Sequence, residues 1–155
     1  MKTYPARRDA GGLRFAIVVS RFNHLICARL LEGCVRELRA RGAASDALHV
    51  AWVPGAYEIP QAARTLATSG RYDAVVTLGV VIRGGTPHFE YVASEVNKGI
   101  ARLSLDLGIP VIQGIITSDN LEQAIERAGA KEGNRGFAAA NGAIEMANLI
   151  KSFGA

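Results

Sequence analysis

The chain has little of what metal and redox proteins depend on. Its 155 residues contain two cysteines and three histidines. Cys27 and Cys34 lie two turns apart on one predicted helix, which is too far for a disulfide between them, so we expect two reduced core thiols. The histidines, His24, His49 and His88, are widely separated, and no Cys/His spacing resembles a zinc site. We therefore expect neither a metal site nor a disulfide.

Long apolar runs and clustered charges are also missing. No apolar run is long enough to cross a bilayer, and the N-terminal segment 1–5 lacks the apolar core of a signal peptide. We therefore expect a cytoplasmic protein that does not contact membranes. The net charge is +4, but the basic residues are dispersed without interleaved aromatics, so no nucleic-acid partner is expected. A positive balance equally suits a small anionic ligand.

What the chain does have is enough apolar material for a full core. Hydrophobic residues make up 49% of it and charged residues 21%. With no linker, repeat or low-complexity stretch, residues 1–155 are expected to form a single domain. Residues 1–12, which end in two glycines, are expected to be an irregular N-terminal arm.

Short apolar runs alternate with segments of helical spacing. Strands are predicted at 15–19, 47–53, 74–82 and 110–116, and helices around 28–38, 58–67, 88–107, 119–127 and 135–153. Asp119 and Glu122 have the spacing of a capping box and are expected to open the fourth helix. The alternation predicts an α/β fold, a three-layer α/β/α sandwich with a four-stranded parallel sheet and the flavodoxin-like strand order 2-1-3-4.

Chemically unusual segments follow each predicted strand. They cover residues 20–24, 54–60, 82–90 and 117–120. In open α/β sheets ligands bind outside the carboxyl ends of the strands, so these segments are expected to meet around one site.

The segment Gly84-Gly85-Thr86 is the most informative of them. It precedes a predicted helix, whose free N–H groups and dipole favour an anion. Gly85 stands where a nucleotide-binding P-loop has its lysine, and the spacer is strand interior, so an ATP or GTP site is rejected. The segment favours a phosphate monoester, and the alternative is a glycine-rich turn that only caps the helix.

Four nearby side chains each have a functional and a structural interpretation. His88 either shuttles protons beside the anion or simply caps the helix. Glu58 either accepts hydrogen bonds from ligand hydroxyls or complements a helix dipole. Phe22 offers either a face for a planar ring or a hydrophobic staple. Arg127 is either a phosphate partner or an ordinary cation at a helix C-terminus, and it has no obvious partner in its own chain.

Together, these segments resemble a known family. Residues 20–23, 54–60, 78–92, 119–129 and 133–136 are similar, in order and spacing, to the signature blocks of the 6,7-dimethyl-8-ribityllumazine synthases. The resemblance implies that 5-amino-6-(D-ribitylamino)uracil condenses with 3,4-dihydroxy-2-butanone 4-phosphate in riboflavin biosynthesis. It also implies that the enzyme needs no cofactor, so positioning and proton transfer carry the catalysis.

The resemblance assigns roles to individual residues. Phe22 stacks on the pyrimidine, Glu58 accepts from ribityl hydroxyls, and the rest of the pyrimidine and ribityl site is formed by Asn23, Ala56, Tyr57, Val80, Val81, Ile82 and position 113. Gly85 and Thr86 hold the phosphate, Arg127 adds charge, and His88 transfers protons. In the family the site lies between adjacent subunits, and Arg127 and position 113 come from the neighbour.

Two positions depart from the family pattern. Position 113 is usually phenylalanine and is Gln113 here, which alters the packing near the ring. Position 135, near the site, is usually lysine and is Arg135 here, which keeps the charge but changes its geometry.

The resemblance also concerns assembly. Family members form pentamers, decamers or sixty-subunit icosahedral shells. The loop 129–134 has no insertion, as in shell-forming members, so a homopentamer and a 60-mer shell are expected. The N-terminal arm is expected to add to a neighbouring subunit, and riboflavin synthase is a candidate partner.

Two other functions compete with the enzyme. A non-catalytic flavin or lumazine binder on the same scaffold would keep Phe22 and Glu58 but lose His88 and Arg127, and both are present. A flavodoxin-like signalling domain would need an acidic cluster after the first strand, and residues 20–23 contain none.

Overall fold

The structure is a computed structural model that describes residues 1–129 and 133–154. Its strands are β1 (Phe15–Ser20), β2 (Leu48–Val53), β3 (Ala74–Ile82) and β4 (Val111–Ser118). Its helices are α1 (His24–Ala40), α2 (Ile59–Ala67), α3 (His88–Asp106), α4 (Leu121–Arg127) and α5 (Arg135–Phe153), with short 3-10 turns η1 (Ser45–Ala47) and η2 (Ala56–Glu58). The four strands form one parallel sheet in the order β2-β1-β3-β4, so the predicted fold is confirmed.

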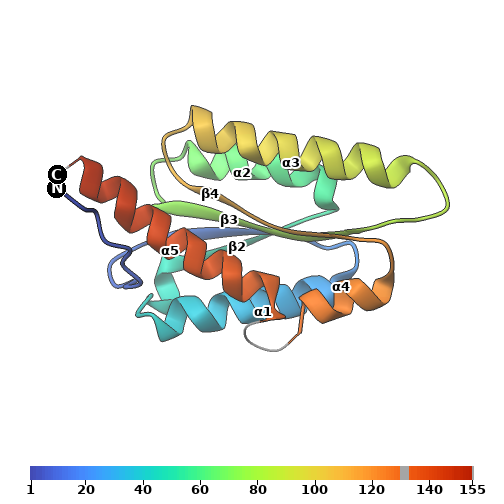
Figure 1. Cartoon of the computed structure of the whole chain (residues 1–155), viewed down its shortest axis with the longest axis horizontal. Helices are drawn as coiled ribbons and strands as arrows, with labels where there is room; N and C mark the ends of the chain where they lie inside the picture. The colour runs from blue at the N-terminus through green and yellow to red at the C-terminus, as the bar shows by residue number, and fades with distance from the viewer. Residues whose placement is uncertain (130–132, 155) are drawn as a thin grey trace.

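Helices cover both faces of the sheet (Figure 1). One face packs its alternate strand residues, such as Ile17, Val76 and Ile116, against α1, α4 and α5. The other face packs Val18, Val75 and Ile115 against α2 and α3. Because β1 and β3 are buried on both faces, they read as continuous apolar runs in the sequence.

The strands differ in length at their carboxyl ends. The pairing of β3 with β1 ends at Val19 and Leu78, whereas its pairing with β4 continues to Ile82 and Ser118. At this point β1 turns toward β2, where the Arg21 amide donates to the Val53 carbonyl at 2.8 Å. The last residues of β3 therefore have a neighbouring strand on one side only.

The start of α4 differs from the prediction. The residue that caps the helix is Asn120, not Asp119, because Asn120 is extended and its side chain accepts from the Gln123 amide at 2.8 Å. The Asp119 carboxylate instead binds Arg83. The capping box predicted from Asp119 and Glu122 was therefore wrong by one residue, and β4 continues two residues beyond the predicted 116.

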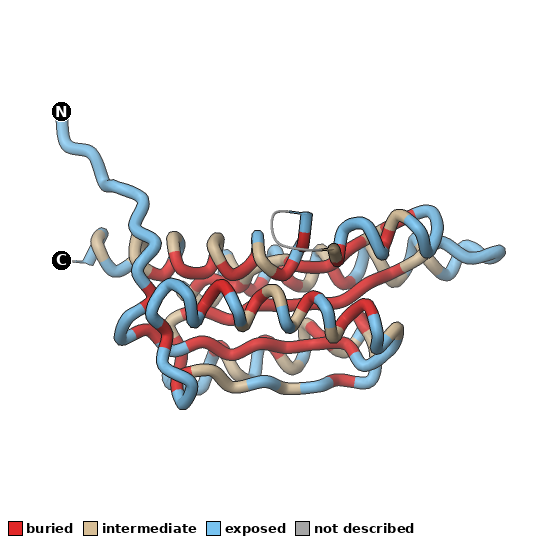
Figure 2. Tube along the Cα trace, turned by 90° about the horizontal axis from the view of Figure 1, so that it is seen from below, coloured by how far each residue is buried: buried red, intermediate tan, exposed pale blue. Residues whose placement is uncertain are grey.

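The N-terminal arm has neither helix nor strand over residues 1–10. Its second half is bound to its own chain: Arg8 pairs with Glu145 at 2.6 Å, and the Asn148 side chain donates to the carbonyls of Arg7 and Asp9. The first residues extend away from the body and are exposed (Figure 2). Within this outer part, the Tyr4 ring packs edge-on against Phe153 of the same chain, with 5.0 Å between the ring centroids.

No helix within the described ranges is both long and apolar enough to cross a membrane. The loop 129–134, on which the expectation of a shell rests, lies partly outside the described residues, since 130–132 are not among them.

Candidate functional site

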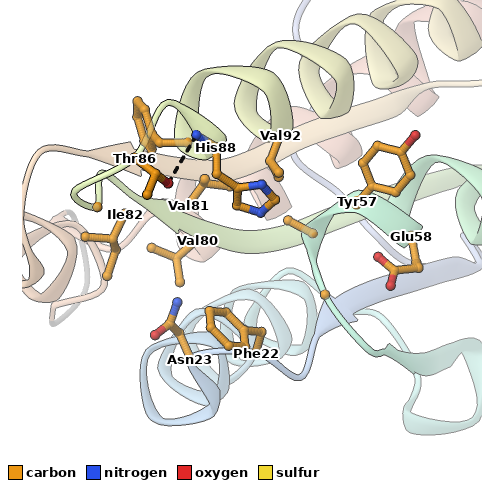
Figure 3. A pocket seen from close by; sticks show the side chains of 14 residues that line it. Phe22, Asn23, Tyr57, Glu58, Val80, Val81, Ile82, Thr86, His88 and Val92 are labelled. Carbon is orange, nitrogen blue, oxygen red and sulfur yellow. Dashed lines mark hydrogen bonds between the residues drawn. The ribbon is translucent and has the colours of Figure 1, made fainter.

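A cavity of about 540 Å³ opens at the carboxyl ends of β1, β2 and β3. The segments that follow these three strands all contribute to its wall, as the sequence predicted from their positions. Figure 3 shows Phe22 and Asn23 on one side, His88 and Val92 opposite them, and Glu58 at one end. Its lining is Phe22, Asn23, Gly55, Ala56, Tyr57, Glu58, Val80, Val81, Ile82, Gly84, Thr86, His88, Phe89 and Val92.

The back of the cavity is the free edge of β3. Val80, Val81 and Ile82 line it, and they lie beyond the last residue that pairs with β1. Apart from the Val80 group that hydrogen-bonds to the Cys27 thiol, backbone N–H and C=O groups on that side are left for a ligand, since buried peptide groups need partners. An apolar floor with an exposed strand edge suits a planar ring that carries its own donors and acceptors.

Phe22 and Asn23 form the turn between β1 and α1. Asn23 has φ 57°, the left-handed conformation, which asparagine tolerates better than most residues. The Phe22 carbonyl accepts hydrogen bonds from Ser20 Oγ at 3.5 Å and Cys27 Sγ at 3.4 Å. These two hydrogen bonds fix the backbone of the turn, while Phe22 stays 70% exposed at the cavity rim. A staple buried against the helix, the structural alternative, would not leave the ring in solvent.

Glu58 lies at the end of η2, where the chain enters α2. A Cβ at Gly55 would approach Glu58 Oε2 at 3.7 Å, so the carboxylate lies next to the Gly55 backbone. Its side chain makes no capping hydrogen bond to α2. The carboxylate is therefore available to a ligand in the cavity.

The turn between β3 and α3 combines open space with a helix start. Within the described chain, a Cβ added at Gly84 or Gly85 would meet no atom within 4 Å. Thr86 Oγ1 accepts from the His88 amide at 3.4 Å, so the threonine does take part in capping α3. The Glu90 amide donates to the Pro87 carbonyl at 3.1 Å, whereas the Phe89 amide precedes the first hydrogen bond of the helix and stays available to an anion. The two interpretations of this turn are therefore compatible.

Arg83 fixes this turn, and sequence reasoning missed it. Its guanidinium binds Asp119 at 3.1 Å and Glu90 at 3.2 Å and lies over the Phe89 ring, 4.7 Å from its centroid. Hydrogen bonds to these two carboxylates raise the pKa of Arg83 above its usual value. The end of β3, the start of α3 and the loop before α4 are thereby joined.

Four predicted site residues are not among those that line the cavity: Gly85, Gln113, Arg127 and Arg135. The expectation that Arg127 has no partner in its own chain was wrong, because its Nη1 donates to the Thr117 carbonyl at 2.7 Å. Gln113 lies on the outer strand β4, and Arg135 begins α5.

Other lining residues were not predicted as site residues. Phe89 and Val92 carry the helical spacing of an apolar face, which indicated core packing, yet both border the cavity at the start of α3. Their position next to His88 was the available signal. Gly55 and Gly84 belong to the unusual segments, but the sequence could not show which of their atoms face inward.

The site offers acid–base and hydrogen-bonding groups rather than metal ligands. No group of three or more His, Cys, Asp or Glu side chains within 1–129 and 133–154 is arranged to hold a metal ion. Cys27 and Cys34 are free and buried, as predicted. Burial raises the pKa of the Cys27 thiol to about 11, against the opposing effect of its hydrogen bond to the Val80 backbone, so it is no nucleophile at neutral pH.

Parallel strands in the order 2-1-3-4, with a ligand-sized cavity beyond their carboxyl ends, place the chain in the class of flavodoxin-like α/β proteins that bind small molecules there. A family model narrows this class, since that of 6,7-dimethyl-8-ribityllumazine synthase matches residues 12–151. The chain belongs to the lumazine synthase family, as its signature blocks predicted. It is an enzyme of riboflavin biosynthesis, and its reaction is the condensation that forms the lumazine.

Proposed function

We propose that the cavity holds 5-amino-6-(D-ribitylamino)uracil beside the phosphate of 3,4-dihydroxy-2-butanone 4-phosphate, and that His88 transfers protons between them. The observation that carries this proposal is the meeting of Phe22, Glu58, His88 and the turn 84–86 around one cavity. These groups come from three separate strand ends.

The pyrimidine would lie between Phe22 and the free edge of β3. The exposed Phe22 ring offers an apolar face for stacking. Backbone groups of Val80 to Ile82 then hydrogen-bond to the ring edge, and Ala56 and Tyr57 border the ribityl chain. The Glu58 carboxylate accepts hydrogen bonds from ribityl hydroxyls, which are stronger than neutral ones because the acceptor is charged.

The phosphate would bind at Gly85 and Thr86. Because no side chain fills the space at the two glycines, an anion can approach the backbone closely and meet the Phe89 N–H at the start of α3. The positive end of the helix dipole adds to this attraction. A guanidinium is still needed to balance the charge, and Arg127 would supply it from a neighbouring subunit.

The reaction then proceeds by two additions and three eliminations. The 5-amino nitrogen attacks the ketone, and loss of water gives a Schiff base. Loss of a proton from the neighbouring carbon expels inorganic phosphate, and the resulting enol tautomerises to a second carbonyl. Attack of the ribitylamino nitrogen on that carbonyl closes the ring with loss of another water. His88, exposed at the cavity wall, can move protons in these steps because imidazole exchanges them near neutral pH.

An assembly with shared sites accounts for residues that lie outside the cavity. Around a groove between α1 and α4, Leu25, Leu121 and Ile125 are 82%, 54% and 43% exposed, which is unusual for large apolar side chains on a monomer. We propose that these side chains are covered in a homopentamer, which brings Arg127 of one subunit to the phosphate of the next. A 60-mer shell, a contribution of the outer arm to a neighbour, a contact with riboflavin synthase and a cytoplasmic location belong to the same proposal.

The direct test is product formation. Pure protein mixed with both substrates is expected to release inorganic phosphate and accumulate a fluorescent lumazine. His88→Ala should slow this turnover by about 100-fold, the usual contribution of a proton-transfer group, and leave pyrimidine affinity within about twofold. Wild-type protein that binds pyrimidine or riboflavin but forms no lumazine at high enzyme concentration would support the non-catalytic binder instead.

A further inference from the structure

The two departures from the family pattern, Gln113 and Arg135, are bonded to each other. Arg135 Nη2 donates to Gln113 Oε1 at 2.6 Å. The Gln113 amide nitrogen donates in turn to Asn97 Oδ1 and to the Ile115 carbonyl, both at 2.9 Å. Asn97 is fixed on α3, where its own amide donates to the Ala93 carbonyl at 2.9 Å.

This network crosses the outer edge of the sheet. Gln113 lies on β4, the last strand of the sheet, while Asn97 and Arg135 come from helices on opposite faces (Figure 1). Both N–H groups of Gln113 are used by acceptors that cannot donate, so its oxygen must face the guanidinium. A phenylalanine at 113 would offer no hydrogen-bond acceptor to the guanidinium.

The network leaves Gln113 with little capacity for a ligand but leaves Arg135 with most of its donors. A guanidinium has five N–H groups, and Gln113 is its one acceptor in the described residues. Arg135 is exposed, and it begins α5, a position where the helix dipole disfavours a cation. Because the helix dipole disfavours this cation, its charge does not serve the stability of the fold, which indicates a role in binding.

Arg135 and Arg127 bind residues at different positions along β4. Arg127 binds the carbonyl of Thr117, near the carboxyl end of the strand, whereas Arg135 binds Gln113. Four residues of strand separate the two anchors by about 13 Å. One guanidinium thus lies near the end of the sheet where the phosphate turn lies, and the other lies farther from it.

We propose that Gln113 is a positioning residue that, with Asn97, fixes Arg135 as a ligand of the pyrimidine substrate, and that positions 113 and 135 act as one coupled unit. This rests on the proposed function, in which the β4 edge of one subunit meets the cavity of the next. The fixed guanidinium donates hydrogen bonds to oxygens of the ribitylaminopyrimidine and leaves the phosphate to Arg127.

A double-substitution cycle tests the coupling through binding, without turnover. Gln113→Phe, Arg135→Lys and the double variant are titrated with 5-amino-6-(D-ribitylamino)uracil alone, and oligomer mass and Tm are measured for each. We expect each single variant to raise the pyrimidine Kd about fivefold to tenfold, the loss of one charge-assisted hydrogen bond. In the double variant the pyrimidine Kd should rise by less than the product of the two single factors. Once one residue of the pair is changed, the hydrogen bond between them is already lost, so the second change costs less.

A second pair of variants tests the role of Asn97 without touching either position. Asn97→Leu removes the acceptor that holds Gln113 and should raise the pyrimidine Kd as Gln113→Phe does. Asn97→Asp keeps that acceptor and should recover most of the affinity, which a merely space-filling role would not explain. The KM for the keto-phosphate should stay within about twofold throughout, since these hydrogen bonds do not reach the phosphate. Arg102→Lys changes an exposed arginine on α3 that pairs with Asp106 and takes no part in the network, so it is the matched control and should change neither constant.

The outcomes separate this proposal from the function on which it rests. If the single effects multiply in the double variant, or the keto-phosphate KM rises instead, the coupled unit is wrong while lumazine formation stands. If wild-type protein binds the pyrimidine but forms no lumazine, the catalytic proposal is wrong and the cycle still tests the coupling through Kd. If wild-type protein does not bind the pyrimidine, both are wrong.

Discussion

At the scale of the residue, the proposed function assigns Arg127 to the phosphate site of a neighbouring subunit. Its guanidinium binds the Thr117 carbonyl and is exposed, and it does not line the cavity of its own chain. One hydrogen bond to a carbonyl leaves several donors for a phosphate.

Arg127→Ala should therefore affect one substrate far more than the other. We expect kcat/KM for the keto-phosphate to fall about 10- to 100-fold, the loss of charged hydrogen bonds to a phosphate, and the pyrimidine Kd to stay within about twofold. Steady-state kinetics with each substrate varied in turn, and Arg102→Ala as a control, measure this. Equal losses for both substrates would argue against a phosphate role.

The buried thiol of Cys34 links the core to pH. Burial raises its pKa to about 12, while an unfolded cysteine titrates near pH 9. The folded state thus favours the protonated thiol. The difference in pKa costs the folded state nothing below pH 9, where the thiol is protonated in both states, and it lowers the unfolding free energy as pH rises from 9 toward 12.

Cys34→Ala should make stability less sensitive to alkali. Between pH 9 and 10 the wild type should lose up to about 1 kcal/mol more of its unfolding free energy than the variant, because the variant lacks one titrating group. Urea unfolding at pH 7, 9 and 10 gives these differences, and the variant's lower stability at pH 7 from the lost side chain cancels in the comparison. Parallel pH profiles for the two proteins would contradict the assignment.

At the scale of elements, the close approach of α1 and α5 sets the position of Arg135. Asn134, which is buried, donates to the carbonyls of Arg29 and Ala128 and accepts from the amides of Gly136 and Phe137. A Cβ at Gly136 would collide with the Leu30 carbonyl of α1. Glycine is therefore required there for packing rather than for an unusual φ.

Two glycines of the same helix provide a matched test of this packing. Gly136→Ala should destabilise the protein by about 1–3 kcal/mol, because a backbone atom of α1 must move. At Gly142 the nearest atom to an added Cβ is Ile112 Cγ2 at 3.7 Å, an ordinary contact. Gly142→Ala should instead be neutral or stabilise by up to about 1 kcal/mol, since alanine favours the helix. Chemical denaturation of both variants measures the contrast, and similar effects would show that the close contact relaxes without strain.

At the scale of the whole molecule, a shared site predicts that two variants of low activity can complement each other in a mixed oligomer. His88→Ala lacks the proton-transfer group, and Arg127→Ala lacks the proposed phosphate ligand. If the two residues come from different subunits, mixed oligomers contain some interfaces with both intact, roughly a quarter for random mixing.

Co-expression of the two variants should therefore recover activity well above that of either one alone. Light scattering on the wild type should give a mass at least five times the 16.4 kDa of the chain. A mixture no more active than its components, with mixed oligomers confirmed by mass spectrometry, would show that each subunit carries a complete site. An active monomer in solution would also show that each subunit carries a complete site.

Local patterns in the sequence were enough to predict the fold and the segments that surround the cavity. Strands buried on both faces must be apolar throughout, so β1 and β3 stood out, and their alternation with helices predicted a parallel sheet covered on both faces. The segments beyond the strands met because the carboxyl ends of parallel strands share one edge. Local chemistry also predicted α5 and the helix start at His88.

Tertiary structure alone decided which side chains meet. The bonds of Arg83 to Asp119, and of Gln113 to Arg135, join residues 36 and 22 positions apart, and no periodicity in the chain encodes such pairs. Asn120 rather than Asp119 caps α4, and the Asp119 carboxylate binds Arg83, which comes from another element. Local patterns specify backbone conformation, but hydrogen-bond partners are chosen only when packing brings distant segments within reach.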